Sequence, residues 1–187
     1  KAAACAAHAR RKFEELSRGG PSASALAEEA LQRFARIYQA EGLLSDMTAE
    51  QRQQARQQLS KPLWDELKAW MQLVGSQVLP GSKVRQAIDY SLQAWDALTL
   101  QLSDGAVAID NNHLEQQIKP WKLGAKNWLF IGSELAGQRA AMVMSLVQSA
   151  KMNGVEPWAY LRDVLARIHN HPYSRIEELL PHRWQAD

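Results

Sequence analysis

The chain has 187 residues, of which 46% are hydrophobic and 22% are charged, and this composition is typical of a folded globular protein and excludes general disorder. The formal net charge of +2 is small, so composition alone does not indicate a nucleic-acid-binding domain, which is usually strongly basic. The single cysteine, Cys5, excludes an internal disulfide framework and favours the reducing cytoplasm. No stretch approaches the roughly 20 apolar residues of a membrane-spanning helix, so we expect no membrane partner.

Apolar residues recur at helical spacing in three parts of the first half of the chain. The pattern covers residues 24–41, resumes after Pro62 and returns after Pro80, and each part predicts an amphipathic helix with one buried face. Residues 22–102 are therefore expected to form a helical bundle. Three tryptophans fall within these apolar stripes, where packing in the core is the favoured role: Trp64, Trp70 and Trp95.

A polar helix is predicted between the first two of these apolar patterns. Thr48, followed three residues later by Gln51, has the form of a capping box, in which each side chain accepts a hydrogen bond from the backbone N–H of the other residue. The residues that follow are mostly glutamine and arginine. We expect this helix to end before Pro62 and to be largely solvated.

The segment after residue 103 mixes strand-like and helical patterns. The apolar run 106–109 is either a short strand or an extended lead into the next element, and 127–131 is a convincing strand-like run. Between them, Asn112 and Glu115 have the spacing of a capping box for a short helix that ends near Pro120.

The last part of the chain, from Ser133 onward, is predicted to be helical. A long helix is expected over 138–152, with Asn153 and Gly154 as its C-terminal cap. Pro157 is expected to begin another helix, because proline is well suited to the first helical position.

Motifs for zinc binding, hydrolysis or nucleotide binding are weak. Cys5 and His8 stand three residues apart, as metal ligands often do, but a structural zinc site needs four ligands and no second pair has such spacing. The remaining histidines form no His-Glu-x-x-His motif, and no glycine-rich phosphate loop is found in the sequence. The sequence therefore gives no support for these classes of site.

Residues 104–134 carry the most specific motifs. They read Asp-Gly-Ala-Val-Ala-Ile-Asp-Asn-Asn-His-Leu-Glu, then Gln-Gln-Ile-Lys-Pro-Trp-Lys-Leu-Gly-Ala, and then Lys-Asn-Trp-Leu-Phe-Ile-Gly-Ser-Glu. The segment resembles the signature of the insertion-sequence 66 family of transposases. In that family an Asp-Asn-Asn tripeptide precedes the last glutamate of an Asp-Asp-Glu catalytic site, and a Lys-Asn-Trp-Leu-Phe run with Gly-Ser-Glu follows. Residues 110–112 and Glu115 match the first part, and 126–130 with 132–134 match the second.

The resemblance extends over nearly the whole chain. Residues 5–13, Cys-Ala-Ala-His-Ala-Arg-Arg-Lys-Phe, are similar to a family motif that usually has tryptophan where this chain has Ala6. The segment 145–161 and the sequence Glu-Leu-Leu-Pro at 178–181 are similar to the C-terminal part of the family. Where this chain has Ala125 the family commonly has arginine, which implies a reduced set of DNA contacts.

The resemblance implies a ribonuclease-H-like catalytic core, a mixed sheet with helices, interrupted by a helical insertion. Residues 1–16 would be the last strand and helix of that core, 22–102 the insertion, 104–134 the return to the core, and 135–187 a helical C-terminal region. The expected fold class is therefore mainly α, a helical bundle plus the C-terminal remainder of the catalytic core with one or two short strands.

The resemblance also implies a role for Glu115. DNA cleavage and strand transfer in such transposases use two divalent ions about 3.5–4 Å apart. Glu115 would be the catalytic glutamate and a ligand of Mg²⁺ or Mn²⁺, while Asp110, Asn111 and Asn112 would shape the start of its helix. The two partner aspartates would precede the first motif, so we expect this chain alone to hold no metal tightly and to be inactive. The alternative is that Glu115 is only the reciprocal capping partner of Asn112.

Basic residues near Glu115 are candidates for DNA contacts. Lysines alternate there with Trp121 and Trp128, a mixture able to neutralise phosphates and to stack on unpaired bases. The alternative is that the lysines are solvated and the tryptophans, Trp128 above all, belong to the core. The candidate DNA-binding residues are Lys119, Lys122, Lys126, Asn127, Arg10 and Arg11.

Two functions are therefore expected. In the first, the chain is the C-terminal part of a DNA transposase that in full length performs metal-dependent cleavage and strand transfer of an insertion sequence, acting on transposon ends as a homo-oligomer. In the second, it is a non-catalytic helical module that binds DNA or its full-length relative and inhibits it. Retention on DNA that weakens steeply with salt would favour a DNA-binding role.

Overall fold

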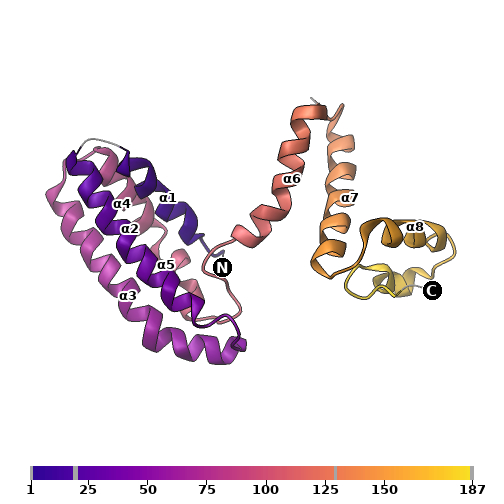
Figure 1. Cartoon of the computed structure of the whole chain (residues 1–187), viewed down its shortest axis with the longest axis horizontal. Helices are drawn as coiled ribbons and strands as arrows, with labels where there is room; N and C mark the ends of the chain where they lie inside the picture. Colours follow the sequence, from indigo (N-terminus) through magenta and orange to yellow (C-terminus); the bar gives the residue numbers. More distant parts are fainter. Residues whose placement is uncertain (1, 19–20, 129, 186–187) are drawn as a thin grey trace. The chain divides into compact units, whose positions relative to one another are not determined.

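The computed structural model describes residues 2–18, 21–128 and 130–185, and the regular elements in these ranges are all helices (Figure 1). The mainly helical fold predicted from the sequence is confirmed. The chain divides into two compact units, Lys1–His113 and Leu114–Asp187, and each has a hydrophobic core of its own. Among the described helices, none is long and apolar enough to cross a membrane.

The first unit is a helical bundle. Its elements are α1 (Ala6–Ser17), α2 (Pro21–Gly42), α3 (Ala49–Gln77), α4 (Lys83–Gln93), α5 (Trp95–Leu98) and the 3-10 helix η1 (Leu100–Leu102). Figure 1 shows the first four helices side by side, and contacts join α1 to α2 and α4, and α3 to α2 and α4. The buried faces of α1 and α2 are rich in small residues, which let helix backbones approach closely: Ala6, Ala9, Ala27 and Ala30.

Aromatic side chains run through the centre of this bundle. The ring of Phe34 lies 6.0 Å from that of Phe13 and 6.4 Å from that of Trp64, and Trp64 packs edge-on against Trp95 at 5.6 Å. Offset and edge-on pairs of this kind add to the free energy gained by burying the rings. Trp64, Trp70 and Trp95 are all buried, so the core role predicted for them is confirmed.

Helix α3 begins as predicted but does not end where the sequence suggested. Thr48 Oγ1 accepts from the backbone N–H of Gln51 at 3.3 Å, and Gln51 Oε1 accepts from that of Thr48 at 3.0 Å, so the capping box is present. The predicted end before Pro62 is wrong, because the helix continues to Gln77. Proline removes one backbone hydrogen bond, and the apolar stripe beyond it holds the helix together through buried side chains: Trp64, Leu67, Trp70, Met71 and Val74.

The polar half of α3 is only partly solvated, which corrects a second expectation. Arg56 is 2% exposed and Ser60 is fully buried. Buried polar groups are stable only when they are hydrogen-bonded, and Arg56 has partners in α2, in η1 and in the loop that follows η1.

The strand-like run 127–131 does not form a strand, and of the two alternatives for 106–109 the short strand is not found; none of the described residues lies in a strand. The first run is irregular, and the second begins as the last residues of α6 (Asn112–Trp128), which also continues through Pro120 instead of ending there. Leu129 lies outside the described residues. A strand needs a partner for its backbone groups, whereas the carbonyl of Val107 is bound by an arginine side chain.

The remainder of a ribonuclease-H-like core stays a prediction, as does the assignment of 1–16, 22–102, 104–134 and 135–187 to parts of such a protein. Within the first unit, α1 shares one hydrophobic core with the helices of 22–102.

The second unit contains most of α6 together with α7 (Glu134–Met152), α8 (Pro157–Arg167) and the 3-10 helix η2 (Tyr173–Leu179). Helix α7 is followed by Gly154, whose φ of 70° is easily adopted only by glycine, and the predicted C-terminal cap is thus confirmed. Helix α8 begins at Pro157 as predicted, and the Glu156 side chain accepts from two backbone N–H groups of its first turn.

The C-terminal segment closes on α8 through two side-chain hydrogen bonds. The Tyr160 hydroxyl donates to the carbonyl of Leu179 at 2.8 Å, and the Trp184 indole N–H donates to Asp163 at 2.6 Å. The ring of Trp184 also packs edge-on against that of Tyr160. The core of this unit is small: Ala150, Tyr160, Val164 and Leu179.

Candidate site at the start of helix α6

A loop without regular structure, residues 103–111, connects the bundle to α6, and Arg56 of α3 holds its first half. The Nη1 group donates to the carbonyls of Gln101 at 2.8 Å, Val107 at 2.9 Å and Asp104 at 3.3 Å. The Nε and Nη2 groups bind the carboxylate of Glu41 at 2.8–3.1 Å. The side chains are 2% and 10% exposed, so this is a buried ion pair whose donors are nearly all used.

Three further side chains on the same side of α3 donate to carbonyls of this loop or of the residue before it. All three lie within about one helical turn of Arg56 on α3. They therefore bind carbonyls close to those that Arg56 binds. These bonds join Arg52 to Gly105 at 3.1 Å, Gln53 to Ser103 at 2.8 Å and Gln57 to Leu102 at 2.6 Å.

Gly105 lies directly against the first turn of α3. A Cβ atom at this position would stand 1.8 Å from the carbonyl oxygen of Ala49 and 2.7 Å from its carbonyl carbon. Such distances are far below van der Waals contact, so only glycine allows the loop to approach α3 this closely.

The second half of the loop ends in a turn that begins α6. Asp110 accepts a hydrogen bond from the Tyr38 hydroxyl of α2 at 2.8 Å, from the backbone N–H of Asn112 at 3.1 Å and from the Asn112 side chain at 3.0 Å. The backbone N–H of Ala6 donates to the carbonyl of Ile109 at 3.1 Å, which joins this turn to the start of α1. Burial raises the pKa of the Tyr38 hydroxyl, and the neighbouring Asp110 carboxylate raises it further, so Tyr38 remains protonated and able to donate.

Helix α6 places Glu115 and three lysines on one face. The spacing from Glu115 to Lys119, Lys122 and Lys126 is four, seven and eleven residues, so the four side chains fall within an arc of about 60°. Glu115 is half-buried in the first turn, and the three lysines are exposed. A carboxylate near the N-terminus and a cation in the last turn both agree with the helix dipole. We call these four residues the charged face of α6.

The apolar side of α6 points in a different direction. Leu114 and Ile118 line a shallow groove together with Met144 and Met152 of α7. These positions lie about 60–100° around the helix from Glu115. The charged face is therefore not the side that lines this groove.

The two tryptophans of α6 pack on each other. The rings of Trp121 and Trp128 are 5.0 Å apart at an interplanar angle of 72°, and Trp128 also lies over Gly124. Trp121 is half-buried, and Trp128 is 51% exposed, so the core role favoured for Trp128 is not found within this unit. In this edge-on pair the edge of one ring lies against a face of the other, so one ring face is not open to stack on a base.

The remaining predicted site residues lie apart along the chain. Asn111 and Asn127 are exposed near the two ends of α6. Arg10 and Arg11 belong to α1 in the first unit, where Arg10 forms an ion pair with Glu14 at 2.8 Å and Arg11 is exposed. The lysines and these arginines thus belong to different units.

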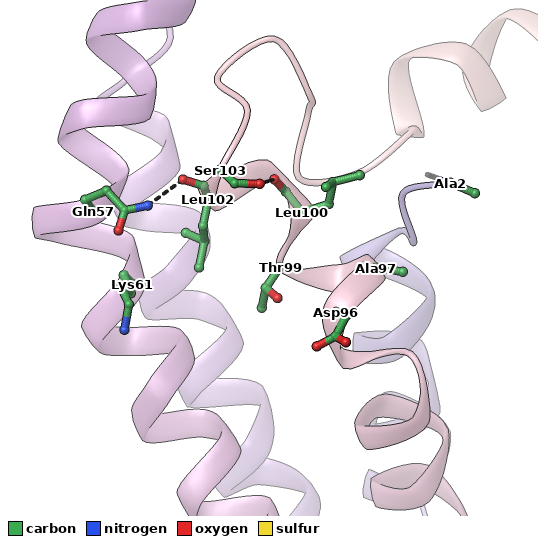
Figure 2. A pocket seen from close by; sticks show the side chains of 9 residues that line it. All are labelled: Ala2, Gln57, Lys61, Asp96, Ala97, Thr99, Leu100, Leu102 and Ser103. Carbon is green, nitrogen blue, oxygen red and sulfur yellow. Dashed lines mark hydrogen bonds between the residues drawn. The ribbon is translucent and has the colours of Figure 1, made fainter.

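Other possible sites offer little chemistry. Across the described ranges, no group of three histidine, cysteine, aspartate or glutamate side chains is placed to hold a metal ion. A shallow pocket in the first unit lies between α3 and η1, where Lys61 and Asp96 are its charged lining residues (Figure 2). Lys61 forms an ion pair with Asp65, and none of the residues predicted for the site lines this pocket.

The sequence is similar to known proteins along almost its entire length. Residues 1–139 match the model of the Transposase IS66 family, and residues 145–182 match the IS66 C-terminal element. The chain belongs to the IS66 transposase family. No solved structure matches it.

Similar proteins of Sinorhizobium fredii (strain NBRC 101917 / NGR234) are longer than this chain. The uncharacterized protein y4hP is 38% identical over 97% of this chain and 35% of its own length, and y4jD is 38% identical over 98% and 36%. The uncharacterized protein y4qI is 36% identical over 99% of this chain and 34% of its own length. The chain therefore spans about a third of these relatives.

The side chains that hold the start of α6 are not among the site residues predicted from the sequence. Tyr38 was placed in an apolar helical stripe, and Arg52 and Arg56 in a solvated helix. The available signal was two arginines four residues apart, which share one helix face. Gly105 stands in an Asp-Gly turn signal, but no pattern in one sequence shows that the turn lies against another backbone.

Proposed function

We propose that this chain is the part of an IS66-family transposase that supplies Glu115 as a metal ligand and the lysines of α6 as contacts to the DNA phosphates beside it. The observation that carries the proposal is the charged face of α6, where Glu115 and Lys119, Lys122 and Lys126 follow one another along one side of a helix. Family membership supports the same assignment.

The chemistry explains why a carboxylate and cations would share one face. Phosphodiester cleavage and strand transfer need divalent ions that activate the attacking oxygen and stabilise the leaving one. Glu115 would hold one such ion, Mg²⁺ or Mn²⁺, together with carboxylates from outside this chain, since Mg²⁺ also retains water and phosphate ligands. The exposed lysines would neutralise phosphates next to the reacting bond.

The length of the lysine row fits a DNA strand. Lys119 and Lys126 are seven residues apart, which is about 10 Å along a helix. This is about the rise of three successive nucleotides in one strand. The full-length protein would bind transposon ends in the cytoplasm as a homo-oligomer.

A DNA retention assay with a matched control tests the lysine contacts. In Lys119→Gln/Lys122→Gln/Lys126→Gln, we expect weaker retention on duplex DNA and a slope of log affinity against log salt that is smaller by about 2–3, because each phosphate contact contributes roughly 0.9. The control, Lys61→Gln/Lys83→Gln/Lys151→Gln, removes the same charge from exposed lysines elsewhere and should keep the slope. An equal loss in both variants would contradict the proposal.

The catalytic part has a separate test. We expect no strand transfer or nicking from this chain alone, because Glu115 cannot assemble a two-ion site by itself. A magnesium-dependent nick that disappears in Glu115→Ala would show that the site is complete within this chain and would overturn that part of the proposal.

A second candidate function is a non-catalytic module that binds the full-length transposase. It is favoured by large apolar side chains exposed on the second unit, since such surfaces often mark protein interfaces: Phe130, Met142, Trp158, Leu165 and Tyr173. Sedimentation of the chain with a full-length family member tests it. Co-sedimentation that is lost in Trp158→Ser would support this role, and no co-sedimentation at micromolar concentrations would exclude it.

A further inference from the structure

We propose that Tyr38 is a positioning residue for Glu115: by donating its hydroxyl hydrogen to Asp110, it fixes the turn from which α6 begins. This inference rests on the proposed role of Glu115 as a metal ligand. Tyr38 would touch neither metal nor DNA, and its effect would pass through Asp110 and Asn112 to the first turn of α6.

Both carboxylate oxygens of Asp110 accept hydrogen bonds. One carboxylate oxygen accepts from the backbone N–H of Asn112, and the other accepts from the Asn112 side chain and from the Tyr38 hydroxyl. The bonds to Asn112 are local and would form in any turn of this sequence. The bond to Tyr38 spans 72 residues, so it ties the Asp110 side chain to the bundle.

Tyr38 is itself well fixed. It stands on α2 and packs against the bundle core next to Ile37, which is fully buried. The backbone bond from Ala6 to Ile109 holds the residue just before Asp110. The turn is thus attached to α2 by a side chain and to α1 by the backbone, two independent points on one unit.

Helix α6 depends on this attachment because its own packing is slight. None of its described residues is buried. A helix without a buried face gains little from burial, so hydrogen bonds at the start of the helix contribute to holding its first turn. Glu115 lies in that first turn, where fraying would displace the carboxylate that has to meet the metal.

The experiment is a double-mutant cycle on the full chain, read by amide hydrogen exchange in α6. Tyr38→Phe removes only the hydroxyl, and we expect amides of Gln116 and Gln117 to exchange about tenfold faster, the size of effect expected for a hydrogen bond to a charged acceptor. Asp110→Ala should also speed exchange there. Adding Tyr38→Phe to Asp110→Ala should have no further effect, because the acceptor is already gone.

Two controls separate positioning from a general loss of stability. Tyr90→Phe makes the same chemical change on the exposed α4 tyrosine and should leave exchange in α6 unchanged. Asp110→Asn keeps an acceptor oxygen, so in that background Tyr38→Phe should again speed exchange. The proposal is overturned if exchange in α6 is unchanged in Tyr38→Phe, or if the effects of Tyr38→Phe and Asp110→Ala simply add.

The result is independent of the test of DNA binding. Loss of coupling between Tyr38 and Asp110 would reject the positioning role while the lysine variants still changed DNA retention. Loss of the lysine effect with the coupling intact would reject the proposed DNA contacts and leave Tyr38 as an anchor of α6.

Discussion

Replacing Arg56 by methionine should destabilise the first unit more than any change at its surface. The variant keeps an unbranched apolar stem but removes the guanidinium that pairs with Glu41, whose side chain is only 10% exposed. Breaking a buried ion pair by removing one partner costs about 3–5 kcal/mol, because the remaining charge stays buried and unpaired. Ser60 still donates to Glu41 at 3.0 Å, which favours the lower part of that range.

The double variant Arg56→Met/Glu41→Leu separates the cost of the unpaired buried charge from the cost of the lost hydrogen bonds to backbone carbonyls. It leaves no buried charge, so it should recover part of the stability. It should not recover all of it, because the carbonyls of Gln101, Asp104 and Val107 lose their donor, at about 1 kcal/mol for each hydrogen bond. We therefore expect the double variant to remain about 2–3 kcal/mol below the wild type.

Urea unfolding followed by tryptophan fluorescence measures these differences, with amide exchange of Leu67 and Met71 assigning the transition to the bundle. The control is Arg36→Met, which breaks a surface pair with Glu66 and should cost no more than about 1 kcal/mol. The reasoning would be refuted if Arg56→Met fell within about 1 kcal/mol of the wild type, or if the double variant were less stable than the single one.

Two further predictions concern the loop and the C-terminal segment. Gly105→Ala should cost about 2–4 kcal/mol in urea unfolding, because its Cβ would overlap the carbonyl of Ala49 and push the loop off α3; Gly42→Ala, which meets nothing within 4 Å, should be neutral or slightly stabilising. The indole of Trp184 lowers the pKa of Asp163, with help from Arg167, so the bond to Trp184 stabilises the folded state above the ordinary aspartate pKa and is lost as pH falls through the lowered value. Trp184 fluorescence should therefore change below about pH 4 in the wild type, and a change of the same size and pH range in Asp163→Asn would contradict this.

Predictions from the sequence are confirmed for features that depend on neighbouring residues alone. The Thr48 capping box, the end of α7 at Gly154 and the start of α8 at Pro157 depend on a few adjacent residues, and all three are present. The burial of Trp64 and Trp95 follows from apolar periodicity, which also needs no distant information.

The errors arose where distant parts of the chain compete with local preference. Pro62 and Pro120 were expected to end helices, yet each removes one backbone bond from a helix that continues on both sides. The run 127–131 has the composition of a strand, but a strand exists only with a partner. At the candidate site, Glu115 and the lysines were identified from a sequence motif. That they bind metal and DNA stays a prediction.

The hydrogen bonds from Arg56 to the loop also determine when folding of the bundle can be completed during synthesis. Its bonds to Gln101 and Val107 close chain segments of 45 and 51 residues, whereas its pair with Glu41 spans only 15. Long closures cost more chain entropy and form later than short ones. A growing chain can thus pair Arg56 with Glu41 early, but Nη1 cannot complete its set of bonds until residue 107 has left the ribosome. The last step in folding of the bundle is then the one that fixes the start of α6.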